Sequence, residues 1–134
     1  MSQPLVNRKV IVVLIAVGVS LLHFVTGPSY RGPFPAFVNG YMIDILLPFA
    51  IYLVLGVAKQ SILRSGIARG AFVFAIGFVT ETLQYFGVPI FGRTFDSLDY
   101  LMFGVGIGLA VLLERVALSR IPGGISPRLG DSTR

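Results

Sequence analysis

The chain has 134 residues, of which 54% are hydrophobic and only 13% are charged. Soluble domains carry about 25% charged residues, so this composition predicts a single domain that lies in a membrane. The chain has no cysteine and one histidine, which excludes disulfides, thiol catalysis and a zinc site built from cysteine or several histidines. A net charge of +5 does not indicate nucleic-acid binding, because the basic residues lie between apolar stretches rather than on one solvated face.

Four apolar stretches approach the roughly 17 to 25 residues that a membrane-spanning helix needs. They are residues 10–26, 41–58, 68–86 and 98–118. The segments between them hold proline, glycine or polar residues that interrupt helices. The sequence therefore predicts an all-α fold, a four-helix transmembrane bundle that makes one domain over residues 1–120. Residues 121–134 are rich in proline, glycine and serine, which predicts a disordered tail.

The basic residues predict how the bundle is oriented. Nine of the eleven lysines and arginines lie before the first stretch, between the second and third, or after the fourth, counting Arg69 at the start of the third stretch and Arg115 near the end of the fourth. Only Arg31 and Arg93 lie in the other two connections. Because lysine and arginine are retained on the cytoplasmic side, both termini are predicted to be cytoplasmic, in a multi-pass protein of the inner (plasma) membrane. The first stretch follows Arg8 and Lys9 as in a signal peptide, but no small-x-small cleavage site follows it, so an uncleaved anchor is expected.

Four of the six acidic residues fall in one zone near the predicted outer face: Asp44, Glu81, Asp96 and Asp99. A carboxylate within the hydrocarbon costs at least a few kcal/mol, so such residues normally face the bundle interior and find partners. The inner half of the bundle, in contrast, is expected to offer few polar groups beyond Tyr52 and Thr80.

The two outer arginines are the expected partners of these acids. Arg93 is predicted to pair with Asp96, Asp99 or Glu81, and Arg31 to pair with Asp44 in the same way. If every pair forms, the cluster is a structural clasp. Four acids to two arginines leave a net negative site, however, unless a carboxyl is protonated or a cation binds. Such crowded acids near a low dielectric are also candidates for a functional site.

Helical spacing predicts which residues face other helices. Glu81 and Gln84 share a stripe with Gly70 and Gly77, so the Glu81 carboxylate is expected to face protein rather than lipid. In the fourth stretch, Gly104 and Gly108 form a G-x-x-x-G step that would also let a helix pack closely.

The order of these residues resembles the signature of the VanZ-like family. The chain reads E-x-x-Q at Glu81 to Gln84, then Arg93, then D-x-x-D at Asp96 to Asp99, and finally the glycine step at Gly104 and Gly108. It departs from the family at Phe103, where members often have asparagine. The resemblance implies an integral membrane protein of the bacterial envelope, from a family named for teicoplanin resistance, with no known cofactor. It covers the residues just quoted, but not Asp44 or Arg31, which are candidates from topology alone.

These features favour a non-enzymatic binding or accessory role in the envelope or in glycopeptide tolerance. The arginines would hold carboxylate or phosphate oxygens, and the acids with Gln84 would take amines, hydroxyls and amides of a cell-wall precursor, a lipid headgroup or a glycopeptide. Other interpretations stay open: a small subunit of a larger membrane complex, a carboxylate-dependent enzyme that acts on a lipid-linked substrate, or a proton or ion pathway. The expected partners are membrane lipids, such an envelope ligand and other membrane proteins, with no nucleic acid. No residue is assigned to catalysis or to a metal.

Overall fold

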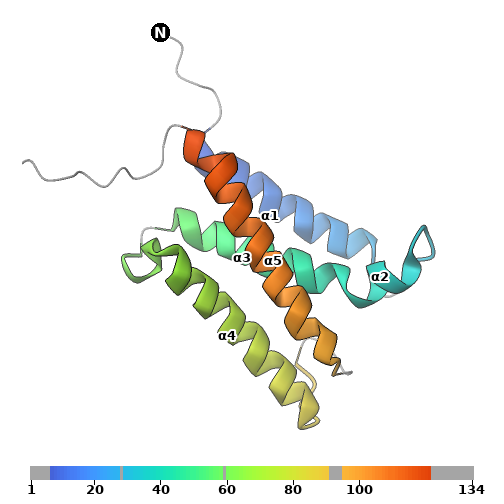
Figure 1. The fold of residues 1–134 in the computed structure, drawn as a ribbon. Helices are drawn as coiled ribbons and strands as arrows, with labels where there is room; N and C mark the ends of the chain where they lie inside the picture. The colour runs from blue at the N-terminus through green and yellow to red at the C-terminus, as the bar shows by residue number, and fades with distance from the viewer. Residues whose placement is uncertain (1–6, 28, 59, 91–94, 122–134) are drawn as a thin grey trace, which may run out of the picture.

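The computed structural model describes residues 7–27, 29–58, 60–90 and 95–121, and these residues form helices without any strand. The α-helices are α1 (Arg8–Val25), α2 (Pro35–Gly40), α3 (Met42–Val57), α4 (Gly66–Tyr85) and α5 (Ser97–Val116). Two short 3₁₀ helices, η1 (Ile62–Arg64) and η2 (Leu118–Arg120), precede α4 and follow α5. The predicted all-α fold is confirmed (Figure 1).

The four predicted apolar stretches coincide with α1, α3, α4 and α5, but they are not equivalent. The helix α1, the helix α4 and the continuous stretch formed by α5 and η2 are long and apolar enough to cross a membrane. The helix α3 has only 16 residues, so its length of about 24 Å falls short of a hydrocarbon core of about 30 Å. The structure thus supports three candidate spans and a shorter apolar helix.

The starts of the long helices are fixed by polar side chains. The side chain of Asn7 accepts from the backbone N–H of Lys9, and that of Ser65 accepts from Ala68. Asp96 does the same for α5 by accepting from Leu98. Each cap satisfies a backbone donor that the helix itself leaves free, which stabilises a helix by about 1 kcal/mol.

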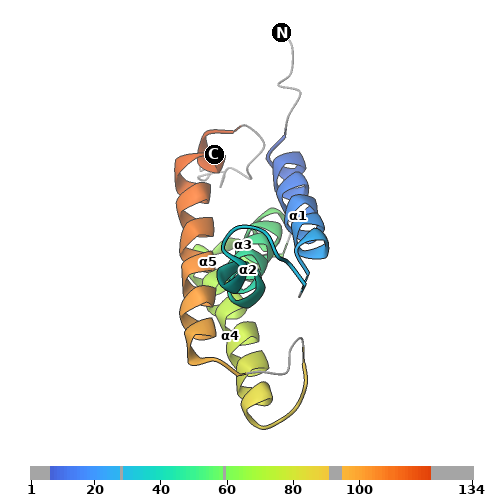
Figure 2. The ribbon, with the colours of Figure 1, turned by 90° about the vertical axis from the view of Figure 1, so that its right-hand side faces the viewer.

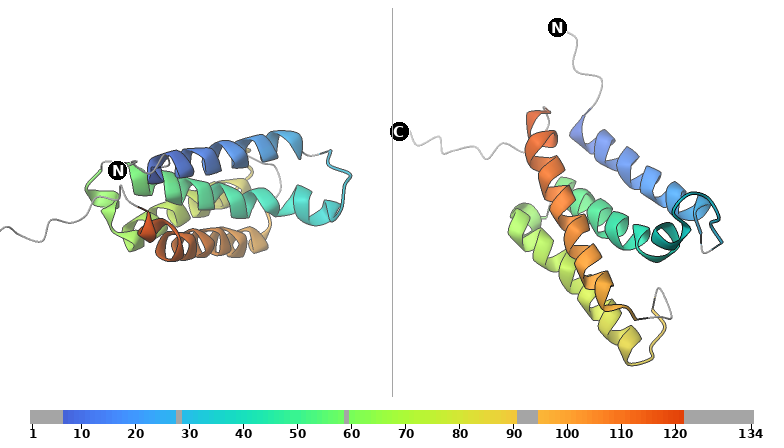
Figure 3. Two further views of the ribbon diagram at one scale, coloured as in Figure 1. Left: turned by 90° about the horizontal axis from the view of Figure 1, so that it is seen from above. Right: turned by 45° about the vertical axis from the view of Figure 1, so that its right-hand side comes forward.

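The short helix α3 is the centre of the bundle. It packs against α1, α4 and α5, and in Figure 2 it lies between α1 and α5. Residues from α1, α3, α4, α5 and η2 meet around it in the core, which comprises Val12, Tyr52, Leu53, Val73, Ala110 and Leu118. The start of α1 and the end of α5 lie at one end of the bundle, and the connection from α4 to α5 lies at the other (Figure 3).

One glycine of α5 determines how closely this helix approaches α3. A Cβ atom at Gly106 would overlap the carbonyl oxygen of Ile45 and would lie 2.9 Å from Cγ of Pro48. On α4, a Cβ atom at Gly77 would overlap the ring of Phe103, and one at Gly70 would touch Ile107 at 3.4 Å. The predicted packing role of Gly70 and Gly77 is consistent with these contacts.

The predicted glycine step behaves differently. A Cβ atom at Gly104 or Gly108 would meet nothing within 4 Å, and both residues are exposed. Within the described part of the chain Gly104 and Gly108 make no close contact with another helix, so packing against a helix of a partner protein stays a prediction. The close contact uses Gly106 instead, because α5 turns the face that carries Asp99, Phe103, Gly106 and Ala110 toward the bundle.

Much of the outer surface is apolar. Phe24 is 86% exposed and Ile67 is 87% exposed, and large aliphatic side chains are exposed along the whole of α1. An apolar surface of this extent is not stable in water and requires lipid or protein around it. This exposure agrees with helices that lie in a membrane.

Candidate functional site

Three side chains from three helices meet around the carboxylate of Glu114 on a fourth helix. We name this group the Glu114 cluster: Arg8, Tyr52, Arg69 and Glu114. Arg69 Nη2 donates to Glu114 Oε1 at 3.0 Å and to Oε2 at 2.9 Å. Tyr52 donates its hydroxyl to Oε2 at 3.1 Å, and Arg8 Nη2 donates to Oε1. A single carboxylate of α5 therefore joins α1, α3 and α4.

The surroundings of Arg69 fit its guanidinium group. Its Cζ atom lies 4.5 Å from the centroid of the Tyr52 ring, which is the geometry of a cation–π contact. A Cβ atom at Gly56 would overlap Nη1 of Arg69, so glycine at this position leaves the space that the guanidinium needs. As a result Arg69 is only 5% exposed although it lies in the second turn of α4.

The Glu114 cluster contradicts one prediction from the sequence. The inner half of the bundle was expected to hold few polar groups beyond Tyr52 and Thr80, and Arg8 and Arg69 were counted as loop charges. Both arginines lie inside helices and share Glu114. The signal that could have revealed this is the position of Glu114 itself, a carboxylate inside an otherwise apolar stretch.

The Glu114 cluster leaves some of its donors without acceptors. Arg8 Nε, Arg69 Nε and Arg69 Nη1 are buried and have no hydrogen-bond partner. A buried donor without an acceptor typically costs about 1–3 kcal/mol. Two guanidinium groups also share a single carboxylate, so the cluster has an excess of positive charge and of donors.

A second group lies at the opposite end of α5, and we name it the carboxyl cluster: Asp44, Glu81, Asp96 and Asp99. Asp99 lies in the first turn of α5, about 22 Å along the helix from Glu114. The charges of Asp44, Glu81 and Asp99 interact with one another across α3, α4 and α5, and Asp96 acts on the last two. The structure therefore brings together the four acids that the sequence placed in one zone.

Asp96 has structural partners for both of its oxygens. Oδ1 accepts from the backbone N–H of Leu98 at 3.0 Å and so caps α5. Oδ2 accepts from the Tyr41 hydroxyl, also at 3.0 Å, which connects the start of α5 to the residue that precedes α3. This hydrogen bond, followed by the negative charge of Asp96, raises the pKa of Tyr41 above its ordinary value.

Glu81 is the least satisfied member of the carboxyl cluster. It is only 4% exposed, which confirms the prediction that it faces protein, and its Oε2 atom is buried without a hydrogen-bond partner. Its neighbour on the stripe, Gln84, donates its amide N–H to the carbonyl of Ile90 at 2.8 Å. Gln84 therefore holds the segment after α4 in place.

Among the described residues, no ion pair joins these acids to an arginine. Arg31 is exposed in the segment between α1 and α2, and both ion pairs among the described residues involve Glu114. The predicted pair of Arg31 with Asp44 is therefore wrong: Arg31 lies in an exposed segment, whereas the charge of Asp44 interacts with those of Glu81 on α4 and Asp99 on α5. Arg93, the other predicted partner, lies outside the described residues.

No three histidine, cysteine, aspartate or glutamate side chains within the described ranges are placed to hold a metal ion. The carboxyl cluster is thus an array of neighbouring acids rather than a preformed cage of oxygen ligands.

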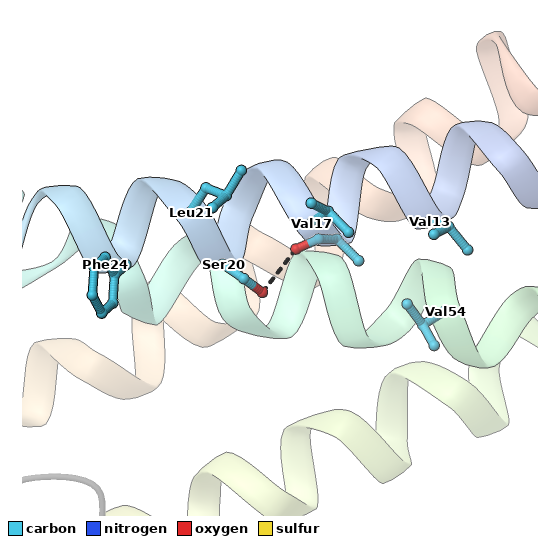
Figure 4. Close-up of a pocket in the computed structure, with 7 residues that line it drawn as sticks. Val13, Val17, Ser20, Leu21, Phe24 and Val54 are labelled. Atoms are coloured by element: carbon cyan, nitrogen blue, oxygen red, sulfur yellow. Dashed lines mark hydrogen bonds between the residues drawn. The ribbon is translucent and has the colours of Figure 1, made fainter.

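A shallow groove runs between α1 and α3, away from both clusters (Figure 4). Its lining is Val13, Ala16, Val17, Ser20, Leu21, Phe24 and Val54. The only hydroxyl there, that of Ser20, donates to the carbonyl of Ala16 at 2.9 Å. The groove therefore offers apolar contacts and no free donor that could orient a polar ligand.

Comparisons with protein-family models, with curated proteins and with solved structures found no match for this chain. The likeness to the VanZ-like family accordingly depends on the residues quoted from the sequence.

Proposed function

We propose that this chain is a small VanZ-like protein of the bacterial inner (plasma) membrane, in which the carboxyl cluster binds an envelope ligand. The protein acts without catalysis, as a binding or accessory factor in the envelope or in tolerance of glycopeptides. Its ligand is a cell-wall precursor, a lipid headgroup or a glycopeptide that presents amine, amide or hydroxyl donors.

The proposed orientation follows from the basic residues. Four helices enter the membrane, α3 as a short central one, with both termini in the cytoplasm. The Glu114 cluster then lies toward the cytoplasm, where arginine and lysine are retained, and the carboxyl cluster lies toward the outside. The ligand would approach from the outer surface, where precursors and glycopeptides occur.

The observation that carries the proposal is the unpartnered Oε2 atom of Glu81. This atom is buried beside the charges of Asp99 and Asp96, so its strongest available partner is a donor from outside the described residues. Charged carboxylates bind ammonium, amide and hydroxyl groups through short, strong hydrogen bonds. In the family pattern Arg93 would hold the anionic part of the same ligand, with Arg31 nearby on the outer surface.

The test is glycopeptide tolerance in a sensitive bacterial host. Expression of the wild-type chain is expected to raise the inhibitory concentration of teicoplanin, and Glu81→Gln is expected to abolish that rise. Asp131→Asn is the matched control, because it removes a carboxylate from the tail and leaves the carboxyl cluster intact. Equal tolerance with and without the chain, at equal membrane levels, would reject the proposal.

A second function is favoured by the exposed face of α5. Gly104 and Gly108 have open space around them, and a helix of another membrane protein fits against such a face. The chain would then be a small subunit of a larger complex. Co-purification after mild detergent extraction tests this, with Gly104→Leu expected to release the partner and Gly18→Leu, at an equally open glycine of α1, expected to retain it.

A further inference from the structure

We propose that the Glu114 cluster is an anion site, in which Arg8 and Arg69 bind the phosphate group of an anionic lipid. This site lies at the opposite end of the bundle from the carboxyl cluster, so it is independent of the function proposed above.

The first argument is the charge of the Glu114 cluster. Two guanidinium groups face one carboxylate, which leaves one positive charge uncompensated within the cluster. The three side chains are largely shielded from solvent, with exposed fractions of 16% for Arg8, 6% for Arg69 and 18% for Glu114. A charge in such surroundings is weakly screened, and it attracts an anion more strongly than an exposed charge does.

The second argument is the set of free donors. Arg69 is more than nine-tenths buried, yet its Nε and Nη1 atoms have no acceptor, and Nε of Arg8 has none either. Glu114 already accepts four hydrogen bonds, from Arg8, Tyr52 and twice from Arg69. The carboxylate is therefore fully used, and the remaining donors have no acceptor among the described residues.

The third argument is that guanidinium N–H donors fit a phosphate group. A guanidinium group presents its N–H donors in a planar fork that matches two oxygens of a phosphate. A phosphate offers enough acceptor oxygens to reach two arginines at once. A single uncompensated positive charge matches the single negative charge of a lipid phosphodiester.

The position of the Glu114 cluster in the bundle favours a lipid headgroup as the source of the phosphate. Arg8 is the first residue of α1 and Glu114 is two residues from the end of α5, so the Glu114 cluster lies at the end of the bundle where α1 begins and α5 ends. Figure 1 shows these two helix ends side by side. Exposed basic residues surround the same end, at Lys9, Arg64, Arg115 and Arg120. Clusters of this kind at the ends of membrane helices attract anionic headgroups. Arg8 and Glu114 are each partly exposed, so a headgroup reaches the cluster through them.

The experiment measures lipid selectivity of the full-length chain. The protein is purified in a mild detergent, incubated with equal amounts of phosphatidylglycerol and phosphatidylcholine, and examined by native mass spectrometry for retained lipid. Phosphatidylglycerol is expected to be retained preferentially. Arg8→Gln is expected to lower that preference about tenfold, as loss of one charged hydrogen-bond donor does. This variant keeps the Arg69–Glu114 pair, so the bundle remains folded.

Two further variants separate an anion site from a purely structural ion pair. Glu114→Gln raises the uncompensated charge, so it is expected to strengthen phosphatidylglycerol binding even as it lowers the temperature of unfolding. Arg64→Gln removes an exposed arginine of the same end and is expected to change neither property. If Arg8→Gln and Glu114→Gln alter thermal stability but leave lipid selectivity equal to that of the wild type, the Glu114 cluster is structural and the proposal is wrong.

Competition identifies the source of the phosphate. Displacement of phosphatidylglycerol by millimolar inorganic phosphate would show that the free ion occupies the same site. Retention of the lipid at that concentration would show that the acyl chains contribute and that a lipid is the ligand. A wild-type protein that retains both lipids equally and binds no phosphate would overturn the proposal.

Discussion

The Glu114 cluster and the carboxyl cluster lie at opposite ends of one bundle and differ in the charges that they bring together. At Glu114, one carboxylate accepts hydrogen bonds from two arginines and a tyrosine, so opposite charges hold four helices together. At the other end, Asp44, Glu81 and Asp99 repel one another across three helices. The comparison indicates that loss of the central carboxylate would cost more stability in the first cluster, where it is paired, than in the second, where like charges lie together.

Removal of one carboxylate charge from each cluster tests this difference most strongly. Glu114→Gln leaves two guanidinium groups without a counter-charge, and the free energy of unfolding is expected to fall by about 3 kcal/mol. Glu81→Gln removes a like-charge repulsion, and the free energy of unfolding is expected to stay the same or to rise by about 1 kcal/mol. Thermal unfolding of both variants in the same detergent measures the contrast. A larger loss of unfolding free energy for Glu81→Gln than for Glu114→Gln would contradict this difference between the two clusters.

The close contact between α5 and α3 depends on Gly106, which has no side chain to separate the two helices. Gly106→Val would place a branched side chain against the carbonyl of Ile45, so the free energy of unfolding is expected to fall by about 1–3 kcal/mol. Gly104→Val is the matched control, two residues away on the open face. It is expected to leave stability unchanged or to raise it slightly, because valine favours a helix more than glycine does. Chemical unfolding of the two variants, followed by circular dichroism, compares them, and equal losses would contradict the close approach of α5 to α3.

The smallest expected effect concerns Tyr41 at the edge of the carboxyl cluster. Its pKa is raised by the hydrogen bond to Asp96, so the folded state holds the phenolic proton more tightly than the unfolded state. The stability that this hydrogen bond adds to the folded state is fully present below the ordinary tyrosine pKa of 10.0. It is lost as the pH rises through the raised pKa of Tyr41 in the folded state. Tyr41→Phe is therefore expected to lower the unfolding temperature slightly near neutral pH and to have no effect at strongly alkaline pH.

Tyr85→Phe is the control for the Tyr41 experiment, because Tyr85 is exposed and its hydroxyl has no hydrogen-bond partner among the described residues. Titration of tyrosinate absorbance should show an alkaline transition that Tyr41→Phe removes and Tyr85→Phe retains. If Tyr85→Phe removed that transition instead, the hydrogen bond to Asp96 would not be the cause.

Some features of the site could be predicted because they depend on neighbours along the helix. The spacing of Glu81 from Gly77 and Gly70 predicted a buried carboxyl group, and the structure confirms it. The same reasoning did not single out Gly106, because helical spacing gives several possible stripes and does not say which one meets a neighbour within the bundle. The contacts of α3 select the stripe that contains Gly106.

Ion pairing was the least predictable feature. Arg31 and Asp44 are close in sequence and share one predicted depth, yet they do not pair in the described structure. Arg8 and Glu114 are 106 residues apart and do pair. Depth in the membrane limits which residues can meet, but the rotation of each helix about its axis decides which of them do, and this rotation depends on packing against the other helices.

The sequence by itself determined that this chain is helical, where its long helices lie and that four of its six acids gather near one end. These properties follow from hydropathy and helical periodicity, which act over a few turns of the chain. Only the tertiary structure decided that Glu114 takes Arg8, Arg69 and Tyr52 as partners, and that Glu81 keeps a free oxygen. Tyr52 and Arg69 stand 62 and 45 residues from Glu114, and contacts over such separations depend on how the helices pack, which no local pattern encodes.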